Sequence, residues 1–348
     1  MAPKVFITGV TGYIAGDAIY AISKAHPDWE YTCLVRTEEK AERVRQAFPS
    51  VKVVLGDLDA SELLEAEASQ ADIVLHAADA SDHEGAAKAI AAGLVKGHSK
   101  NNPGYWLHTG GTGILTYNDS KDNFAGLGKW SDKQYNDASG IEELTNLPDD
   151  AFHRNVDKIV LETGIKHHES VKTVIVCPPT IYGKGRGPVS VRGRQLYELA
   201  KLVLQKGYIP IIGEGKARWN SVHVGDLSDV YLLLSEKAAK GDTSDELWGA
   251  KGYILTENGE HIWGDLARHV GREAARLGLI SEPREGSLGK DEAIDQAGFE
   301  AVSWGLNSRG NAERARKFLG WKPSRPSIEE EVPDTLKQEN ERIKGPAV

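Results

Sequence analysis

A short apolar run near the start of the chain stops at two closely spaced glycines, in the sequence Val5-Phe6-Ile7-Thr8-Gly9-Val10-Thr11-Gly12-Tyr13-Ile14-Ala15-Gly16. The β-branched run predicts a strand, and the apolar spacing after Gly12 predicts a helix. Gly9 can adopt backbone angles closed to other residues, and Gly12 leaves room for a pyrophosphate against the backbone. The helix N-terminus adds unpaired N–H groups and the positive end of its dipole. This context favours a dinucleotide-binding turn over an ordinary glycine-rich connection.

Apolar runs and helical patterns alternate through the first half of the chain. The expected strands are 5–8, 31–36, 51–55, 72–76, 105–109 and 171–177, and the expected helices include 13–25, 38–47, 85–95 and 152–163. Such alternation predicts an α/β fold, a doubly wound Rossmann-type parallel sheet with helices on both faces. After Pro178-Pro179 the regular alternation of strand and helix patterns ends. We expect a nucleotide-binding domain at 1–180, to which 220–240 returns, and a smaller C-terminal substrate lobe at 181–219 and 241–340.

Composition excludes several function classes. The 348 residues carry a net charge of −9, so the surface is expected to repel nucleic acid and anionic membranes. The two cysteines, Cys33 and Cys177, lie in apolar runs that read as buried strands, and no metal-ligand spacing is present. No secretory signal and no run long enough to span a bilayer are found, so we expect a soluble, cytoplasmic protein.

The end of the second expected strand bears on the cofactor. NAD sites usually place Asp or Glu there, whereas a basic residue suits the 2′-phosphate of NADP. This chain has Arg36 and no acid at that point. We therefore favour NADP(H) over NAD(H). Asp57, after the third strand, is expected to accept from the adenine amino group, and His76-Ala77-Ala78 supplies small residues where the backbone must lie along the cofactor.

Together these motifs resemble the extended and atypical short-chain dehydrogenase/reductase superfamily, especially its epimerase-like members that are common in fungi. The matching segments are Thr8–Ile14, Gly56-Asp57-Leu58, His76-Ala77-Ala78, Pro178–Gly183, Val222–Leu227 and the stretch from Asn307 to Pro323. The resemblance implies a cofactor site made of Gly9, Thr11, Gly12, Tyr13, Ile14, Arg36, Asp57, Leu58, His76, Ala77, Ala78, Thr109, Lys158 and Pro178. It also implies a homodimer as one arrangement, through the helix that contains Lys158.

The superfamily's chemistry depends on a Tyr-x-x-x-Lys pair on one helix face. In this chain Lys158 matches the lysine, which holds the nicotinamide ribose in the family, and Arg154 stands at the tyrosine position. Arginine stays protonated and is a poor proton donor, and loss of a general acid costs about 10²- to 10⁴-fold in rate. Arg154 could stabilise a developing oxyanion or bind a substrate carboxylate; alternatively, it packs outward or pairs with Asp157 or Asp150. His153 is a conceivable substitute acid, but its neighbouring position favours a surface histidine.

The hydroxyl that holds the substrate oxygen in the family also differs. Gly110-Gly111 replaces the usual serines, so Thr112 is the expected hydroxyl and Thr109 the alternative. Tyr117 and Tyr182 are expected to flank the pocket.

Further residues are assigned to the substrate lobe on the same resemblance. The expected substrate contacts are Tyr182, Trp219 and His223, and an arginine set could bind a nucleotide-sugar diphosphate or be solvated: Arg186, Arg192, Arg194 and Arg218.

The leading hypothesis is an NADP-dependent oxidoreductase that reduces a small carbonyl- or imine-type substrate, with Lys158, Thr112 and Arg154 as the catalytic set. No metal, nucleic acid or membrane is expected as a partner. The alternative is an NADP-binding regulator or sensor that has lost catalysis. A sugar-nucleotide epimerase ranks third, because reversible oxidation of a hydroxyl needs the missing base.

Overall fold

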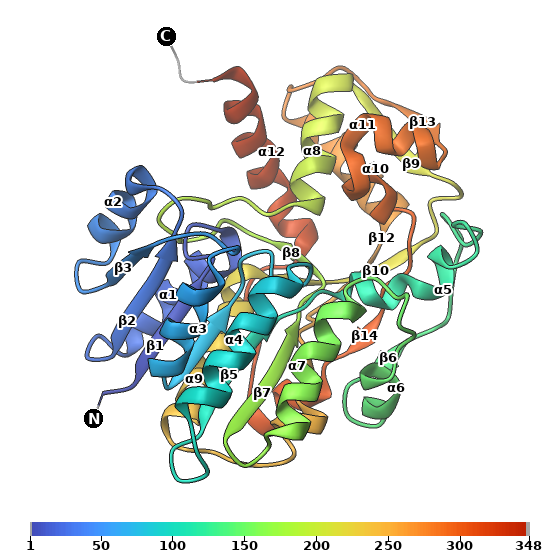
Figure 1. Cartoon of the computed structure of the whole chain (residues 1–348). Coiled ribbons are helices and arrows are strands. Elements are labelled where there is room, and N and C mark those ends of the chain that lie inside the picture. The colour runs from blue at the N-terminus through green and yellow to red at the C-terminus, as the bar shows by residue number, and fades with distance from the viewer. Residues whose placement is uncertain (1, 346–348) are drawn as a thin grey trace.

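A parallel seven-stranded sheet forms the centre of the protein, and the computed structural model describes residues 2–345 (Figure 1). The strand order is β3-β2-β1-β4-β5-β7-β11. The bounds are β1 Lys4–Thr8, β2 Glu30–Val35, β3 Lys52–Leu55, β4 Ile73–His76, β5 Gly104–Thr109, β7 Val171–Cys177 and β11 Tyr253–Leu255. The chain winds outward from β1 in one direction and from β4 in the other, which confirms the predicted doubly wound α/β fold.

Helices cover both faces of this sheet. α3 packs against α4 and α4 against α7 on one face, whereas α1 packs against α9 on the other (Figure 1). The bounds are α1 Tyr13–Ala25, α2 Glu38–Ala47, α3 Ser61–Gln70, α4 Glu84–Gly97, α7 Arg154–Lys166 and α9 Val224–Ala239. The helix expected from residue 152 begins at Arg154, because His153 adopts a left-handed backbone conformation with φ of 68°.

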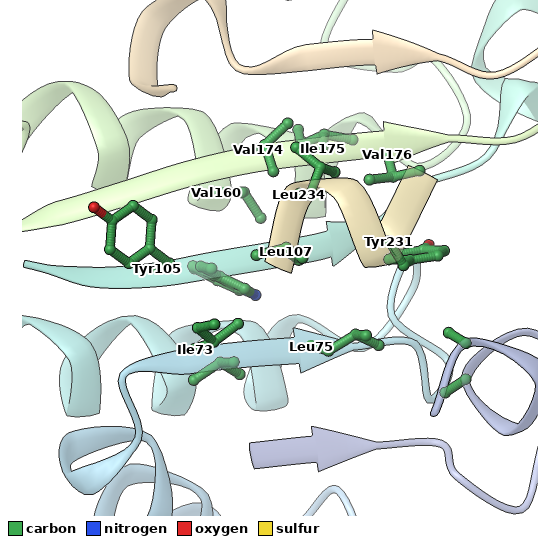
Figure 2. Close-up of a cluster of buried hydrophobic side chains, with 14 of the residues drawn as sticks. Ile73, Leu75, Tyr105, Leu107, Val160, Val174, Ile175, Val176, Tyr231 and Leu234 are labelled. Carbon is green, nitrogen blue, oxygen red and sulfur yellow. The ribbon is translucent and has the colours of Figure 1, made fainter. Parts of the chain in front are cut away.

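The first hydrophobic core lies between the sheet and these helices. β7 is buried along its whole length, as expected for a central strand covered on both faces. Figure 2 shows Ile73 of β4, Leu107 of β5 and Val174 of β7 together with Tyr231 and Leu234 of α9. The core therefore fixes the carboxyl ends of the central strands relative to one another.

A smaller lobe with a second hydrophobic core lies beyond the carboxyl ends of those strands (Figure 1). Its strands are β8 Thr180–Tyr182, β9 Tyr208–Ile212, β10 Arg218–His223, β12 Glu260–Ile262 and β13 Arg284–Leu288. Its helices are α8 Gln195–Lys206, α10 Trp263–Arg276, α11 Lys290–Ser303 and α12 Ile328–Lys344.

Two later segments return to the first core. β11 pairs in parallel with β7, and Trp248, Ala312 and Trp321 are buried in the first core. The sequence-based division placed all of 241–340 in the lobe. We therefore propose that 247–255 and 312–321 belong to the nucleotide-binding domain; in sequence they are too short and irregular to show a βαβ pattern.

Shorter elements complete the structure. They are α5 Tyr117–Ser120, α6 Ile141–Thr145, β6 Tyr135–Asn136, β14 Gly310–Asn311 and helical turns at Thr112–Thr116, Gly249–Lys251 and Ala315–Leu319. Across residues 2–345, no helix combines the length and the apolar character that a bilayer crossing requires. Cys33 and Cys177 are buried free thiols, and burial raises the pKa of both.

Candidate active site

The turn after β1 is built so that only glycine fits. Gly9 has φ of 86°, and a Cβ on it would lie 2.8 Å from the backbone carbon of Ala77 and 2.8 Å from the nitrogen of Ala78. Gly12 caps α1 without any side-chain hydrogen bond, so the amides of the first helical turn face the glycine turn. A bare backbone cradle at a helix N-terminus fits a pyrophosphate, which is the group that a dinucleotide would place there.

Thr8 and His76 connect the carboxyl ends of the neighbouring strands β1 and β4. The Thr8 hydroxyl lies 2.6 Å from Nδ1 of His76 and accepts from the amides of Ala77 and Ala78 at 3.3 and 3.4 Å. Burial, together with the charge of His83, lowers the pKa of His76 to about 3, so its imidazole is neutral. The structure thus gives His76 a supporting position beneath the turn, and the backbone of Ala77 and Ala78 forms the surface beside Gly9.

The expected adenosine contacts lie at the same edge. Arg36 follows β2 directly and is exposed, and Asp57 follows β3 and is also exposed. Because Val35 is paired with Leu55, the two strand ends are adjacent. Asp57 accepts from the Asp59 amide at 3.0 Å, which fixes its carboxylate, and the exposed Arg36 guanidinium suits a phosphate. The side chain of Leu58 is half-buried in the same loop.

The segment 183–193 closes over α1. The Tyr13 hydroxyl donates to the carbonyl of Gly183, and a Cβ on Gly16 would lie 3.1 Å from the Cα of Gly187. Arg186 reaches the fully buried Asp17 of α1 through its amide at 2.8 Å and through its guanidinium. Burial would raise the pKa of Asp17, but the hydrogen bonds from Arg186 and from Ser228 outweigh it and hold that pKa below its usual value. Tyr13 therefore anchors the segment 183–193 against α1, whereas Thr11 lies in the glycine turn and Ile14 in the first turn of α1.

The segment that follows β5 lies at the same edge of the sheet, on the opposite side of β1 from Arg36. Thr112 is buried, its amide donates to the Pro178 carbonyl at 3.0 Å, and its carbonyl accepts from Ser308 at 2.6 Å. Within residues 2–345 its hydroxyl has no hydrogen-bond partner. Thr109 is instead engaged, with its hydroxyl 2.6 Å from that of Tyr231. Of the two candidate hydroxyls, Thr112 is thus the one without a partner in the described part of the chain, and its oxygen is buried.

His153 lies against this glycine-rich segment. A Cβ on Gly111 would lie 3.4 Å from His153 Nε2, and one on Gly113 would lie 3.2 Å from it. Its other ring nitrogen, Nδ1, lies 2.6 Å from Oδ1 of Asp82, on the loop between β4 and α4. The His153 side chain is only 10% exposed. The sequence-based preference for a surface histidine is therefore wrong, because the left-handed backbone at His153 turns the ring out of the helix and into the site.

Asp157 continues this face of α7 one turn later. It is 1% exposed, and its Oδ1 would lie 3.5 Å from a Cβ on Gly110. Its Oδ2 accepts from the Tyr253 hydroxyl at 2.9 Å. Burial raises the pKa of Asp157 to about 6, against the lowering effect of the Tyr253 hydrogen bond. The pair facing the glycine segment, four residues apart, is therefore His153 and Asp157.

Arg154 and Lys158 occupy a different face. The Arg154 guanidinium is buried and donates to the Thr145 carbonyl at 2.9 Å. The Lys158 ammonium donates to both oxygens of Asp149 at 2.9 Å and borders a cavity of about 310 Å³ on the outer side of α7. The structure thus does not bring either side chain into contact with Thr112. Their expected catalytic roles remain predictions.

The substrate residues expected from sequence lie mainly in cores and caps. Tyr182 is fully buried and donates to the Pro326 carbonyl at 2.8 Å. Trp219 is 4% exposed and packs edge-on to Trp263. His223 caps α9 by accepting from the Gly225 amide at 3.0 Å. No contact of these three side chains with Thr112 is found within residues 2–345, so their substrate role also remains a prediction.

The four lobe arginines are all ion-paired. Arg186 pairs with Asp17, Arg192 with Glu339 and Glu198, Arg194 with Glu300, and Arg218 with Asp132 and Glu260. Only Arg194 has a mostly exposed side chain, at 83%. These pairs leave little free positive charge for a diphosphate.

Sequence reasoning missed two members of this site. Asp82 lies 71 residues from His153 and belongs to no motif, so no local sequence pattern predicts their contact. Asp157 could have been found, because His153 and Asp157 repeat the four-residue spacing of the expected pair one position earlier.

Comparison with known proteins places the chain in a family. Residues 150–247 match the model of the NAD dependent epimerase/dehydratase family. The chain is 39% identical over 349 residues to "Oxidase ucsJ" of Acremonium sp, covering 99% of both proteins.

Solved structures share the fold at low identity. The PbgP3 protein of Burkholderia pseudomallei has a TM-score of 0.67 at 15% identity, covering 97% of this chain and 96% of that one. The dTDP-glucose 4,6-dehydratase of Bacillus anthracis, in complex with NAD, has a TM-score of 0.65 at 15% identity, covering 98% of each chain. The sheet, the glycine turn and these matches together show that the chain belongs to the NAD-dependent epimerase/dehydratase family, within the extended short-chain dehydrogenases/reductases.

Proposed function

We propose that the chain is an NADP-dependent oxidoreductase that reduces a small carbonyl- or imine-type substrate. One observation supports this most: a single edge of the sheet holds the glycine cradle at Gly9, the exposed Arg36 on one side of it and the unpartnered hydroxyl of Thr112 on the other. The family uses a nicotinamide dinucleotide, and the "Oxidase" name of the Acremonium relative agrees with redox chemistry.

The residues present fit such a cofactor. The amides of the first turn of α1 would hold the pyrophosphate, and the Arg36 guanidinium would pair with a 2′-phosphate in two parallel hydrogen bonds. The surface of Ala77 and Ala78 would lie along the ribose. When bound, the nicotinamide supplies the electron pair that reduces the substrate carbon.

Thr112 would position the substrate. Its hydroxyl could donate one hydrogen bond to a carbonyl oxygen or to an imine nitrogen once a bound substrate displaces the atoms that cover it. Since a hydroxyl without a partner costs free energy when buried, a ligand that accepts from it recovers that energy.

Two exposed aromatic side chains suggest an apolar substrate. Phe152, just before α7, and Phe299, on α11 of the lobe, are 44% and 46% exposed, and their ring centroids lie 5.2 Å apart. Phe152 also contacts His153, with ring centroids 3.7 Å apart. The site is thus bordered by apolar surface, while the lobe arginines are ion-paired. We therefore favour a small, partly apolar carbonyl or imine over a nucleotide sugar.

A second candidate function is supported by one observation. Arg154 and Lys158, at the positions of the family's catalytic pair, contact Thr145 and Asp149 instead of the glycine segment. A scaffold that binds NADP without turnover would act as a regulator or sensor of the cofactor.

The experiment that separates these functions combines binding with turnover. NADPH binding is measured by calorimetry, and NADPH consumption is followed by absorbance with 4-nitrobenzaldehyde as the first probe of a carbonyl and imine panel. The enzyme proposal predicts binding and turnover, and predicts that Thr112→Val lowers kcat/KM by about 10- to 100-fold without weakening NADPH binding. Binding without turnover across the panel would support the sensor. Absence of NADPH binding would refute both.

A further inference from the structure

We infer that His153, oriented by Asp82, is the group that gives its proton to the substrate, at a site whose family tyrosine position holds Arg154. The inference rests on the proposed oxidoreductase function. It assigns the step that the family's tyrosine performs to a residue that the sequence offered only as a conceivable substitute acid.

The backbone places the imidazole where a donor is needed. His153 has φ of 68°, and its carbonyl accepts from the amides of Val156 and Asp157 at 3.2 Å each, so it is the cap and not the first residue of α7. The ring leaves the helix axis and lies over the glycine segment that contains Thr112. The absence of side chains at Gly111 and Gly113 leaves room beside Nε2, since a Cβ at either would lie within 3.4 Å of it.

Asp82 fixes which nitrogen faces the site. Its carboxylate accepts from Nδ1–H of the imidazole at 2.6 Å, which leaves Nε2 toward the glycine segment. No hydrogen-bond partner of Nε2 is found within residues 2–345. Burial would raise the pKa of Asp82, but the hydrogen bond and charge of His153, with Ser81 and Arg194 nearby, hold it below its usual value. Asp82 is therefore a carboxylate at neutral pH and can stabilise the imidazolium.

A second contact locks the two elements together. Asn155, on the first turn of α7, donates to Glu84 at the start of α4 at 2.9 Å. The loop that contains Asp82 and the cap residue His153 are thus fastened at two adjacent points. Such a double attachment limits movement of the imidazole relative to Thr112.

The other candidate donors are already engaged. The Tyr117 hydroxyl donates to Asp150 at 3.3 Å, and that of Tyr182 donates to a backbone carbonyl. The Arg154 guanidinium is held by the Thr145 carbonyl and stays protonated. His153 is the remaining candidate from the sequence, and its Nε2 lies against Gly111 and Gly113 with no hydrogen-bond partner within residues 2–345.

The step balances in atoms and charge. The imidazolium of His153 would break its Nε2–H bond and give the proton to the carbonyl oxygen or imine nitrogen of the substrate, where an O–H or N–H bond forms. The hydride that the adjacent substrate carbon needs would be supplied by the reduced cofactor when it is bound. Neutral imidazole remains, with Nδ1–H still bonded to Asp82. Because the Asp82 side chain is 48% exposed, solvent can then return a proton to the pair.

A chemical-modification experiment tests the placement without relying on turnover. Diethyl pyrocarbonate acylates neutral imidazole nitrogens, and peptide mass spectrometry locates the adducts. We expect His153 to be modified in the free protein and protected by saturating NADP⁺. His168, exposed beyond the far end of α7, is the internal control and should react equally in both samples. The inference would be overturned if bound NADP⁺ did not slow the modification of His153. It would also be overturned if His153 did not react in the free protein.

Turnover with 4-nitrobenzaldehyde tests the proton transfer. His153→Gln should lower kcat by about 10²- to 10⁴-fold with NADPH affinity unchanged, and added imidazole should restore part of the rate of His153→Ala. Asp82→Asn, a change in a positioning residue, should lower kcat by about 10- to 100-fold and leave KM unchanged. His168→Gln is the matched control.

The outcomes separate the two claims. Normal turnover in His153→Gln would refute the inference and leave the oxidoreductase proposal standing. Failure of the wild-type protein to bind NADP⁺ would refute the oxidoreductase proposal and the inference together.

Discussion

Replacing Asp157 by Asn is expected to change the pH dependence of stability. Asp157 is 1% exposed behind Gly110, and its hydrogen bond with the Tyr253 hydroxyl is its only side-chain partner within residues 2–345. An amide oxygen can accept from Tyr253 as the carboxyl group does, and the two side chains have nearly the same volume. The substitution therefore removes a titratable group and little else.

The size of the effect follows from the pKa. Burial raises the pKa of Asp157 from its ordinary value of 3.8 to about 6, and a rise of that size corresponds to about 3 kcal/mol. Between pH 3.8 and about pH 6 the folded protein holds a proton on Asp157 that the unfolded chain has released. The free energy of unfolding therefore falls as the pH rises through this interval. Above about pH 6 both states are ionised and the full contribution is lost.

The free energy of unfolding of the wild-type protein should therefore fall by about 3 kcal/mol relative to that of the Asp157→Asn variant as the pH rises from about 4 to 7. Urea unfolding followed by tryptophan fluorescence at several pH values measures both free energies. Asp137, whose pKa burial also raises to about 6, titrates in both proteins and cancels in the difference. A difference between variant and wild type that does not change with pH would refute the reasoning.

Three further substitutions test the surrounding structure. Gly9→Ala should lower the free energy of unfolding by about 1–3 kcal/mol, because alanine must adopt the left-handed angles there, and NADPH titration should show binding weakened by at least about tenfold. Lys158→Ala should change NADPH affinity by less than about twofold if its exposed pair with Asp149 is its main contact; a tenfold loss would instead support the ribose role expected from the sequence. Arg186→Met leaves the buried carboxylate of Asp17 without its cation and should cost about 2 kcal/mol in urea unfolding, less than for a fully buried pair because the guanidinium is partly exposed; an unchanged midpoint would contradict this.

Much of the fold could be predicted because its signals are local. A β-branched run, Gly9 and the helical spacing after Gly12 lie within one short stretch, and each has a physical reason to adopt its conformation. The same holds for Arg36, whose place at a strand end follows from the boundary of β2 alone. The strand order then follows from the winding rules of parallel sheets.

The sequence could name the proposed proton donor, His153, only as a conceivable substitute acid, because its placement depends on one backbone angle and one distant contact. Helical spacing assigned His153 to a regular turn, where its side chain would point away from Lys158's face, but its positive φ releases it from that geometry. Asp82 approaches it only once β4 and α7 are placed in the sheet layers. Positive φ at a histidine has no reliable sequence signature. Matching the Tyr-x-x-x-Lys motif to the chain therefore placed Arg154, and not His153, at the tyrosine position.

Cofactor preference tests the central claim most directly. Dissociation constants for NADPH and NADH are measured by calorimetry on the wild-type protein, on Arg36→Ala and on Arg43→Ala, a control for an exposed arginine on α2. The account predicts that the wild-type protein binds NADPH at least about tenfold more tightly than NADH, and that only Arg36→Ala removes this preference. Equal affinity for the two dinucleotides, or unchanged NADPH affinity in Arg36→Ala, would contradict it.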